Sequence, residues 1–113
     1  MHMTDLCKEI AKMGKGIGNE NRYHILETLM RGPRTVGEIA VMAKLPQPSV
    51  SQNLKVLKGA DLVLDERSGQ EIYYSINVSY MASLLKKLAL DVERSEVSTK
   101  KKKIKSNSKN NVR

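Results

Sequence analysis

The sequence predicts a mainly α-helical fold with one two-stranded β-hairpin just before the C-terminal helix. Apolar residues recur at intervals of three and four along five segments, the spacing that gives a helix one buried face. Near residue 70, two β-rich runs instead flank a short segment that contains a glycine, which is typical of a hairpin. The 113 residues suit a single domain.

The first two expected helices lie on either side of a glycine-rich segment. Thr4 is expected to cap a helix over residues 4–15, and Asn19 a helix over residues 20–31. The buried stripe of the second helix is expected to consist of Ile25, Leu26, Leu29 and Met30. A flexible hinge is expected at the glycines, because no strand precedes them as in a nucleotide-binding loop. These glycines are Gly14, Gly16 and Gly18.

Residues 35–57 predict two short helices joined by a tight turn. Thr35 and Glu38 form the Thr-x-x-Glu pattern of a capping box, which opens a helix to about Ala43. The second helix is expected to begin near Pro48, since proline suits a first helical position. At about 100° per residue, its apolar face comprises Val50, Leu54 and Leu57. Its other face carries polar and basic side chains: Ser49, Ser51, Gln52 and Lys55.

A helix face of this kind suits the major groove of DNA. Hydroxyl and amide groups can meet base edges there, and a lysine can meet a phosphate. We therefore predict that the helix starting near Pro48 reads duplex DNA, with Gln47 as a further contact. The alternative is an ordinary solvated helix surface.

The β-rich runs at residues 62–64 and 71–76 flank the expected hairpin tip. Arg67 and Gln70 at this tip are predicted to contact the DNA backbone or minor groove, and an ordinary polar tip is the alternative. Asn77 is expected to cap a last helix that ends near Glu93. Its apolar stripe and that of the first helix are expected to form a subunit interface, although packing within one chain would also cover them. The predicted interface residues are Leu6, Ile10, Met13, Met81, Leu84, Leu85 and Leu88.

The net charge of +8 is concentrated at the C-terminal end. Residues 1–93 hold 12 Lys and Arg against 11 Asp and Glu, a net +1, whereas residues 94–113 hold 8 against the single acid Glu96, a net +7. We expect residues 1–93 to form the DNA-binding and dimerisation domain and residues 94–113 to be a disordered basic tail. This tail either keeps the chain soluble or adds affinity for DNA.

Other features of the sequence favour a cytoplasmic protein that is not an enzyme. The sequence shows neither an apolar leader nor an apolar run of membrane-spanning length. The single cysteine excludes an intramolecular disulfide, so Cys7 is either a small packed side chain or a redox-sensitive thiol across a dimer. The few His and acidic residues fall on unrelated faces, so we expect neither catalysis nor a cofactor.

The order of these elements and three blocks of sequence resemble the winged-helix repressors of the arsenical-resistance (ArsR/SmtB) family. The blocks are NRYHIL at residues 21–26, QPSVSQNLKVL at residues 47–57 and IYYSI at residues 72–76. The resemblance covers roughly residues 17–92. It implies a winged helix-turn-helix homodimer, joined through its first and last helices and bound to a near-palindromic operator until an inducer releases it.

The sequence departs from the family at its metal sites. Metal-sensing members carry a Cys-x-Cys pair in the helix before the turn, but residues 36–43 contain neither Cys nor His. Other members carry Asp and His ligands on the last helix, and residues 79–93 contain no His. We therefore expect no metal site, and any inducer is a different small molecule or a redox signal. Two further departures concern DNA recognition. In the block at residues 47–57 the family often has His where Asn53 stands, and Gly is common near Asp61. These departures bear on which operator sequence is recognised.

We therefore predict a sequence-specific transcriptional regulator that acts as a dimeric repressor. One alternative is an architectural protein that binds DNA without sequence preference through its lysine-rich tail. Another is a winged-helix module that binds protein partners.

Overall fold

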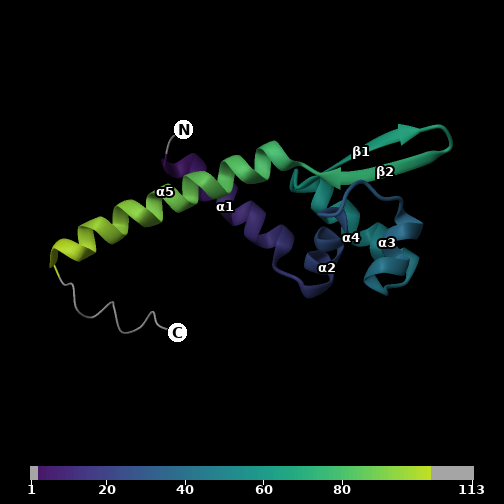
Figure 1. The fold of residues 1–113 in the computed structure, drawn as a ribbon, viewed down its shortest axis with the longest axis horizontal. Helices are drawn as coiled ribbons and strands as arrows, with labels where there is room; N and C mark the ends of the chain where they lie inside the picture. Colours follow the sequence, from purple (N-terminus) through teal and green to yellow (C-terminus); the bar gives the residue numbers. More distant parts are fainter. Residues whose placement is uncertain (1–2, 103–113) are drawn as a thin grey trace.

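A computed structural model describes the backbone of residues 3–102 and the side chains of residues 5–95. Over this range the chain forms five helices and one antiparallel pair of strands (Figure 1), which confirms the predicted fold class. In chain order the elements are α1 (Met3–Ile17), α2 (Glu20–Leu29), α3 (Val36–Ala43), α4 (Gln47–Gly59), β1 (Val63–Ser68), β2 (Glu71–Ile76) and α5 (Val78–Lys102).

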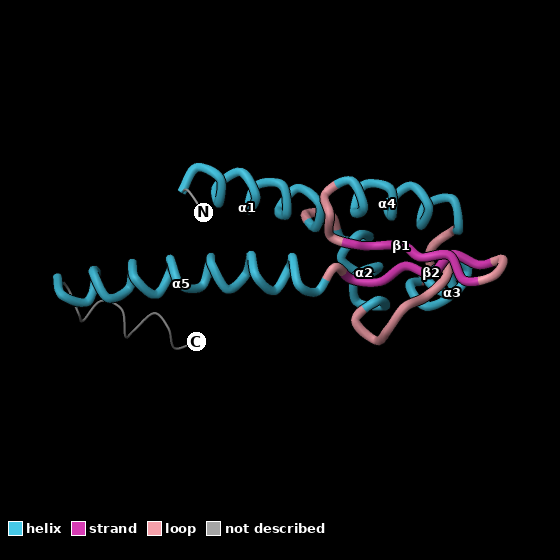
Figure 2. The backbone as a smooth tube through the Cα atoms, turned by 90° about the horizontal axis from the view of Figure 1, so that it is seen from above, coloured by secondary structure: helices cyan, strands magenta, loops and turns pink. Residues whose placement is uncertain are grey.

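The molecule has a globular part and a helical projection. Helices α2 to α4 pack together beside the hairpin, whereas α1 and α5 extend from the other side and contact one another. Figure 2 shows that α5 continues well beyond the start of α1. None of the described helices has the length and apolar character needed to cross a membrane.

The core lies where α2, α3, α4 and the start of β1 meet. Burying a large apolar side chain stabilises a fold by about 1.5–3 kcal/mol, so these residues hold the helices in place. The largest fully buried side chains are Ile25, Leu26, Ile39, Val50, Leu54, Leu57, Leu62 and Val63. Met13 of α1 and Leu84 of α5 complete the cluster and join the projection to the globular part.

Two of the three glycines that we expected to form a hinge lie inside α1, so that expectation is wrong for Gly14 and Gly16. At Gly16 the absence of a side chain allows close packing. A Cβ atom there would lie 2.7 Å from Cδ1 of Leu62 and 3.3 Å from Cβ of Ala60. The glycine therefore permits α1 to approach the end of α4, which is a role in packing rather than in flexibility.

The end of α2 and the start of the hairpin turn also differ from the expectation. Met30 is 58% exposed rather than buried, because α2 ends at Leu29 and Met30 lies beyond its apolar stripe. Arg67 lies within β1, opposite Ile72, so that only Gly69 and Gln70 form the hairpin turn.

Helix α5 continues to Lys102 instead of ending near Glu93. The added segment is rich in Glu, Lys and Arg, which favour helices, and Arg94 forms an ion pair with Asp91 at 2.9 Å. The remainder of the expected basic tail, residues 103–113, lies outside the described residues.

Candidate nucleic-acid interface

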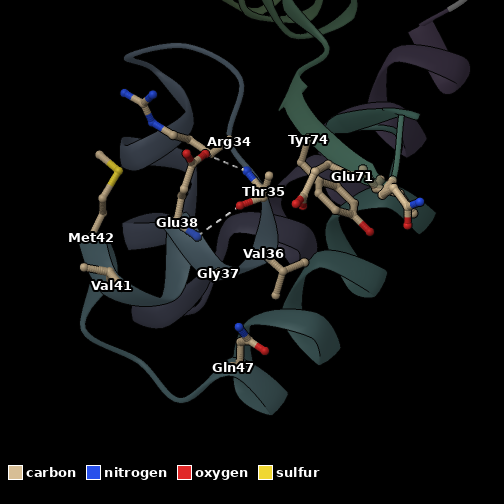
Figure 3. A pocket seen from close by; sticks show the side chains of 12 residues that line it. Arg34, Thr35, Val36, Gly37, Glu38, Val41, Met42, Gln47, Glu71 and Tyr74 are labelled. Atoms are coloured by element: carbon tan, nitrogen blue, oxygen red, sulfur yellow. Dashed lines mark hydrogen bonds between the residues drawn. The ribbon is translucent and has the colours of Figure 1, made fainter. Parts of the chain in front are cut away.

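Hydrogen bonds define both ends of α3, and the second of these ends leads into the turn before α4. The predicted capping box is present, since the Thr35 amide donates to Oε1 of Glu38 at 3.0 Å and the Glu38 amide donates to Oγ1 of Thr35 at 3.2 Å (Figure 3). Lys44 ends the helix in the left-handed conformation, with φ of 58°. Leu45 then packs against the core, so that α4 begins at a defined angle to α3.

Helix α4 separates an apolar face from a polar face as predicted. Val50, Leu54 and Leu57 are buried, which confirms the predicted packing face. The helix begins at Gln47, one residue before Pro48, because Pro46 occupies the cap position. On the other side Ser51, Gln52 and Lys55 are exposed, Gln47 is exposed at the start, and Ser49 is half-buried.

One side chain of α4, that of Asn53, is held by a residue of another helix. Its Oδ1 accepts a hydrogen bond from Nη1 of Arg22 at 3.2 Å. Its Nδ2 donates to the carbonyl oxygen of Ser49 at 2.9 Å and lies 3.4 Å from the Ser49 hydroxyl. The sequence prediction did not include Arg22, because it lies 31 positions from Asn53 and helical periodicity relates only near neighbours.

The hairpin is attached to the segment that precedes α3. The amide of Arg34 donates to the Tyr74 carbonyl at 3.0 Å, and the Tyr74 amide donates back to the Arg34 carbonyl at 2.8 Å. These two bonds add a short bridge to the edge of β2. They fix the hairpin relative to α3 and therefore relative to α4.

An open groove of about 840 Å³ lies between α3, the start of α4 and β2 (Figure 3). Two residues predicted to contact DNA, Gln47 and Gln70, line this one groove although they come from different elements. Arg67, the other residue of the hairpin predicted to contact DNA, is exposed on β1 opposite Ile72 of the lining but does not itself line the groove. The lining residues are Arg34, Thr35, Val36, Gly37, Glu38, Val41, Met42, Gln47, Gln70, Glu71, Ile72 and Tyr74.

The two lysines on the exposed part of α4 differ in their partners. Nζ of Lys58 lies 2.8 Å from Oδ2 of Asp65, and this hydrogen bond raises the pKa of Lys58 above its usual value. Within the described part of the chain, Lys55 has no such ion pair. Lys55 is therefore the α4 cation that is available to an external anion.

The residues predicted for a subunit interface fall into two groups. Met13 and Leu84 are 5% and 2% exposed, so they are already buried within one chain, and Leu6, Ile10 and Met81 are partly buried against the core. By contrast, Leu85 and Leu88 are 47% and 37% exposed on α5. Three further apolar residues of this helix that the sequence prediction did not include are also exposed: Val78, Leu90 and Val92.

The described residues offer few side chains for metal binding or thiol chemistry. Across the described residues there is no cluster of three or more His, Cys, Asp and Glu side chains. The Cys7 side chain is exposed on α1, so it is not packed within the single chain.

A helix-turn-helix followed by an antiparallel hairpin and a C-terminal helix defines a winged helix-turn-helix DNA-binding protein, and the hairpin is its wing. Residues 19–64 match the family model described as "Bacterial regulatory protein, arsR family". The transcriptional repressor SdpR of Bacillus subtilis (strain 168) is 40% identical over 67 residues, which are 59% of this chain and 74% of that protein. The chain belongs to the arsR family, whose members are transcriptional regulators and not enzymes.

Solved structures of similar proteins share this architecture. One is the homodimeric winged helix-turn-helix DNA-binding domain of Mb0332 from Mycobacterium bovis, with a TM-score of 0.65, 30% identity and coverage of 81% of this chain and 85% of that domain. Another is the transcriptional repressor BigR from Xylella fastidiosa, with a TM-score of 0.64, 29% identity and coverage of 76% and 88%.

Proposed function

We propose that this regulator is a dimeric repressor that binds a near-palindromic operator through α4. The observation that carries the proposal is the division of α4 into a buried apolar face and an exposed face of hydroxyl, amide and ammonium groups. The repressors SdpR and BigR, to which the chain is similar, support repression as the outcome of binding. Binding to an operator would take place in the cytoplasm of a bacterium, where its chromosome lies.

The exposed side chains divide by the part of DNA that they suit. Ser49, Ser51 and Gln52 can exchange hydrogen bonds with base edges in the major groove, and an amide such as that of Gln52 can bind adenine through two bonds. Lys55 suits a phosphate, which adds affinity without sequence information. Gln47, which lines the groove between α3 and the wing, suits a phosphate or a base edge. Gln70, which lines the same groove, and Arg67 on β1 suit the DNA backbone or minor groove.

The dimer is inferred from the apolar surface of the projection. Leu85 and Leu88 are exposed on α5, and α5 contacts α1, which carries the partly buried Leu6 and Ile10; a second copy would cover these apolar side chains. The homodimeric Mb0332 domain supports this arrangement. Two-fold symmetry then sets the half-sites about 10 base pairs apart, centre to centre. Residues 1–93 would form this DNA-binding and dimerisation unit, and residues 94–113 a basic extension.

Release from DNA would follow from a change in the distance between the two α4 helices. We propose a signal other than a metal ion, because residues 36–43 of the helix before the turn carry neither Cys nor His.

Selection from a pool of random DNA duplexes tests the proposed function. We expect the protein to enrich an inverted repeat with half-sites about 10 base pairs apart. Salt-sensitive binding without enrichment would contradict the proposal and support an architectural role for the basic tail. Absence of binding even in dilute buffer would instead support a module for protein partners.

A further inference from the structure

Three hydrogen-bonded side chains connect the end of α1 to the start of α4. Arg22, in the first turn of α2, donates from Nε to the Gly16 carbonyl at 2.5 Å and from Nη2 to the Lys15 carbonyl at 3.3 Å. Its third contact is Oδ1 of Asn53. Asn53 in turn reaches the carbonyl and hydroxyl of Ser49, one turn earlier in α4. We call these residues, Arg22, Asn53 and Ser49, the relay.

The chemistry of arginine sets the direction of every bond in the relay. A guanidinium group carries only hydrogen-bond donors. Asn53 must therefore present its Oδ1 atom to Arg22, which leaves its Nδ2 donor facing Ser49. The hydroxyl oxygen of Ser49 accepts from that donor, so its own proton is free to point away from the protein. In this arrangement Ser49 can act as an outward hydrogen-bond donor.

The relay lies between the core and the exposed face of α4. Arg22, Asn53 and Ser49 are all half-buried, whereas Ser51, Gln52 and Lys55 on the same helix are exposed. Partial shielding from water makes hydrogen bonds stronger and their geometry more constrained. Arg22 also satisfies carbonyl groups in the last turn of α1, which have no partner within their helix. A shift of that end of α1 would therefore displace Arg22.

We propose that Arg22 and Asn53 are positioning residues for DNA recognition. They hold the Ser49 hydroxyl as a donor to an acceptor on the operator, and they make its orientation depend on the position of α1. This inference rests on the proposed function of α4. The acceptors that fit are phosphate oxygens and the N7, O6 and O4 atoms of bases in the major groove.

The Asn53→Asp substitution tests the polarity of the relay. The new carboxylate has nearly the same shape and still accepts from Arg22, but it has no donor for Ser49. The Ser49 hydroxyl then donates inward to the carboxylate instead of outward. The experiment compares four proteins, the wild type, Asn53→Asp, Ser49→Ala and the double variant. Their affinities are measured for the duplex that the wild type enriches from the random pool.

We expect Ser49→Ala to weaken binding about fivefold in the wild type, as for one neutral hydrogen bond. In the Asn53→Asp background the same substitution should weaken binding by less than about twofold, because the outward donor is already lost. The added negative charge affects both members of that pair and cancels in the comparison. An equal loss in both backgrounds would overturn the relay, while enrichment by the wild type would still support the proposed function.

A measurement without DNA provides an independent check. The Asn53 side-chain amide resonances should shift in Arg22→Lys and in Ser49→Ala, whereas the Asn77 amide, which donates to the Asp61 carbonyl, should not. Far-UV circular dichroism of each variant establishes that it is folded. Asn53 resonances that stay unchanged in both folded variants would show that the relay is absent, even in a protein that binds its duplex.

Discussion

At the scale of single residues, the DNA reading that we propose depends on which side chains of α4 the core leaves uncovered. Burial of Val50, Leu54 and Leu57 fixes the rotation of the helix about its axis. That rotation directs Ser51, Gln52 and Lys55 to solvent. Packing therefore determines, before any DNA is bound, which face of α4 is available for the proposed contacts with bases.

Removing an amide or hydroxyl from this face should relax base preference. We expect Gln52→Ala and Ser51→Ala to lower discrimination at one or two operator positions, by about 1–3 kcal/mol where two hydrogen bonds to a base are lost. Affinities for a set of single-base operator variants measure this effect. Ser79→Ala, which removes an exposed hydroxyl at the start of α5, serves as the control. Base preferences identical to those of the wild type would show that the face is wrongly assigned.

Removing the Lys55 ammonium group should change affinity rather than base preference. We expect Lys55→Ala to weaken binding to all duplexes alike and to reduce the salt dependence by about 0.9 in log–log slope, the value for one phosphate contact. Titrations at several salt concentrations provide the measurement. Lys86→Ala, which removes an exposed lysine of α5, is the matched control. An unchanged slope would exclude a phosphate contact for Lys55.

Side chains that follow the helical period could be predicted from the sequence, and side chains that depend on distant partners could not. The buried and exposed faces of α4 follow from a period of about 3.6 residues. The Arg22–Asn53 contact instead joins residues from two helices that only the folded core brings together. Met30 continues the apolar pattern of α2, but the helix ends before it.

At the scale of elements, the start of α3 depends on its capping box. We expect Thr35→Ala to lower the free energy of unfolding by about 1 kcal/mol, because the Glu38 amide loses its acceptor. Thr35→Ser keeps the hydroxyl and should retain most of that stability. Urea denaturation measures both variants. Equal losses in the two variants would show that the hydroxyl bond does not stabilise α3.

The junction of α1 and α5 contains a second polar cluster. The Tyr80 hydroxyl of α5 donates to Oε1 of Glu9 in α1, and Lys12 Nζ lies 6.0 Å from the centre of the Tyr80 ring. Lys12 also forms an ion pair with Asp61 at 2.9 Å, just after α4. Asp61 has a positive φ of 63°, and its carbonyl accepts from Asn77. The cluster therefore ties α1 both to α5 and to the end of α4.

This cluster predicts a loss of stability at alkaline pH. The hydrogen bond to Glu9 raises the pKa of Tyr80 above its usual value of 10.0. A pKa raised by folding gives stability that is fully present below about pH 10 and is lost as the pH rises through the higher folded value. Thermal unfolding of the wild type and Tyr80→Phe should therefore differ by a constant amount below about pH 10 and converge above it. A constant difference through pH 11 would contradict this role of Tyr80.

Element types could be predicted from the sequence more reliably than element ends. The capping box of α3 and the hairpin are local patterns, and both are present. In the sequence, the glycines near residue 16 indicate a break in the helix. The structure shows instead that Gly16 lies within α1 and packs against Leu62, a distant contact that the sequence does not reveal. The composition of residues 94–102 suggests disorder, but these helix-favouring residues extend α5 to Lys102.

At the scale of the whole molecule, the exposed leucines of α5 predict a dimer. We expect the double substitution of Leu85→Glu and Leu88→Glu to give a folded monomer that binds the operator weakly, because two negative charges would oppose each other across the interface. Light scattering after size-exclusion chromatography measures the oligomeric state. Leu64→Glu changes a leucine of the wing that is at least as exposed as these two and should leave the dimer intact. A double variant that remains dimeric would contradict this interface.

A dimer joined through α1 and α5 would place two α4 helices at a fixed separation. Arg22 connects the end of α1 to Asn53 of α4. The Lys12–Asp61 ion pair connects α1 to the segment just after α4. We therefore expect a change at the proposed subunit interface to reach the α4 helices through these side-chain contacts. This is the route by which we propose that an inducer would alter operator affinity.

The central claim is that paired α4 helices read one face of the same duplex. The most direct measurement compares the selected operator with a version that carries about 5 additional base pairs between its half-sites, which turns one half-site to the opposite side of the helix. We predict at least a tenfold loss of affinity, and recovery when about 10 base pairs are inserted instead. Equal affinity for all three duplexes would contradict the account.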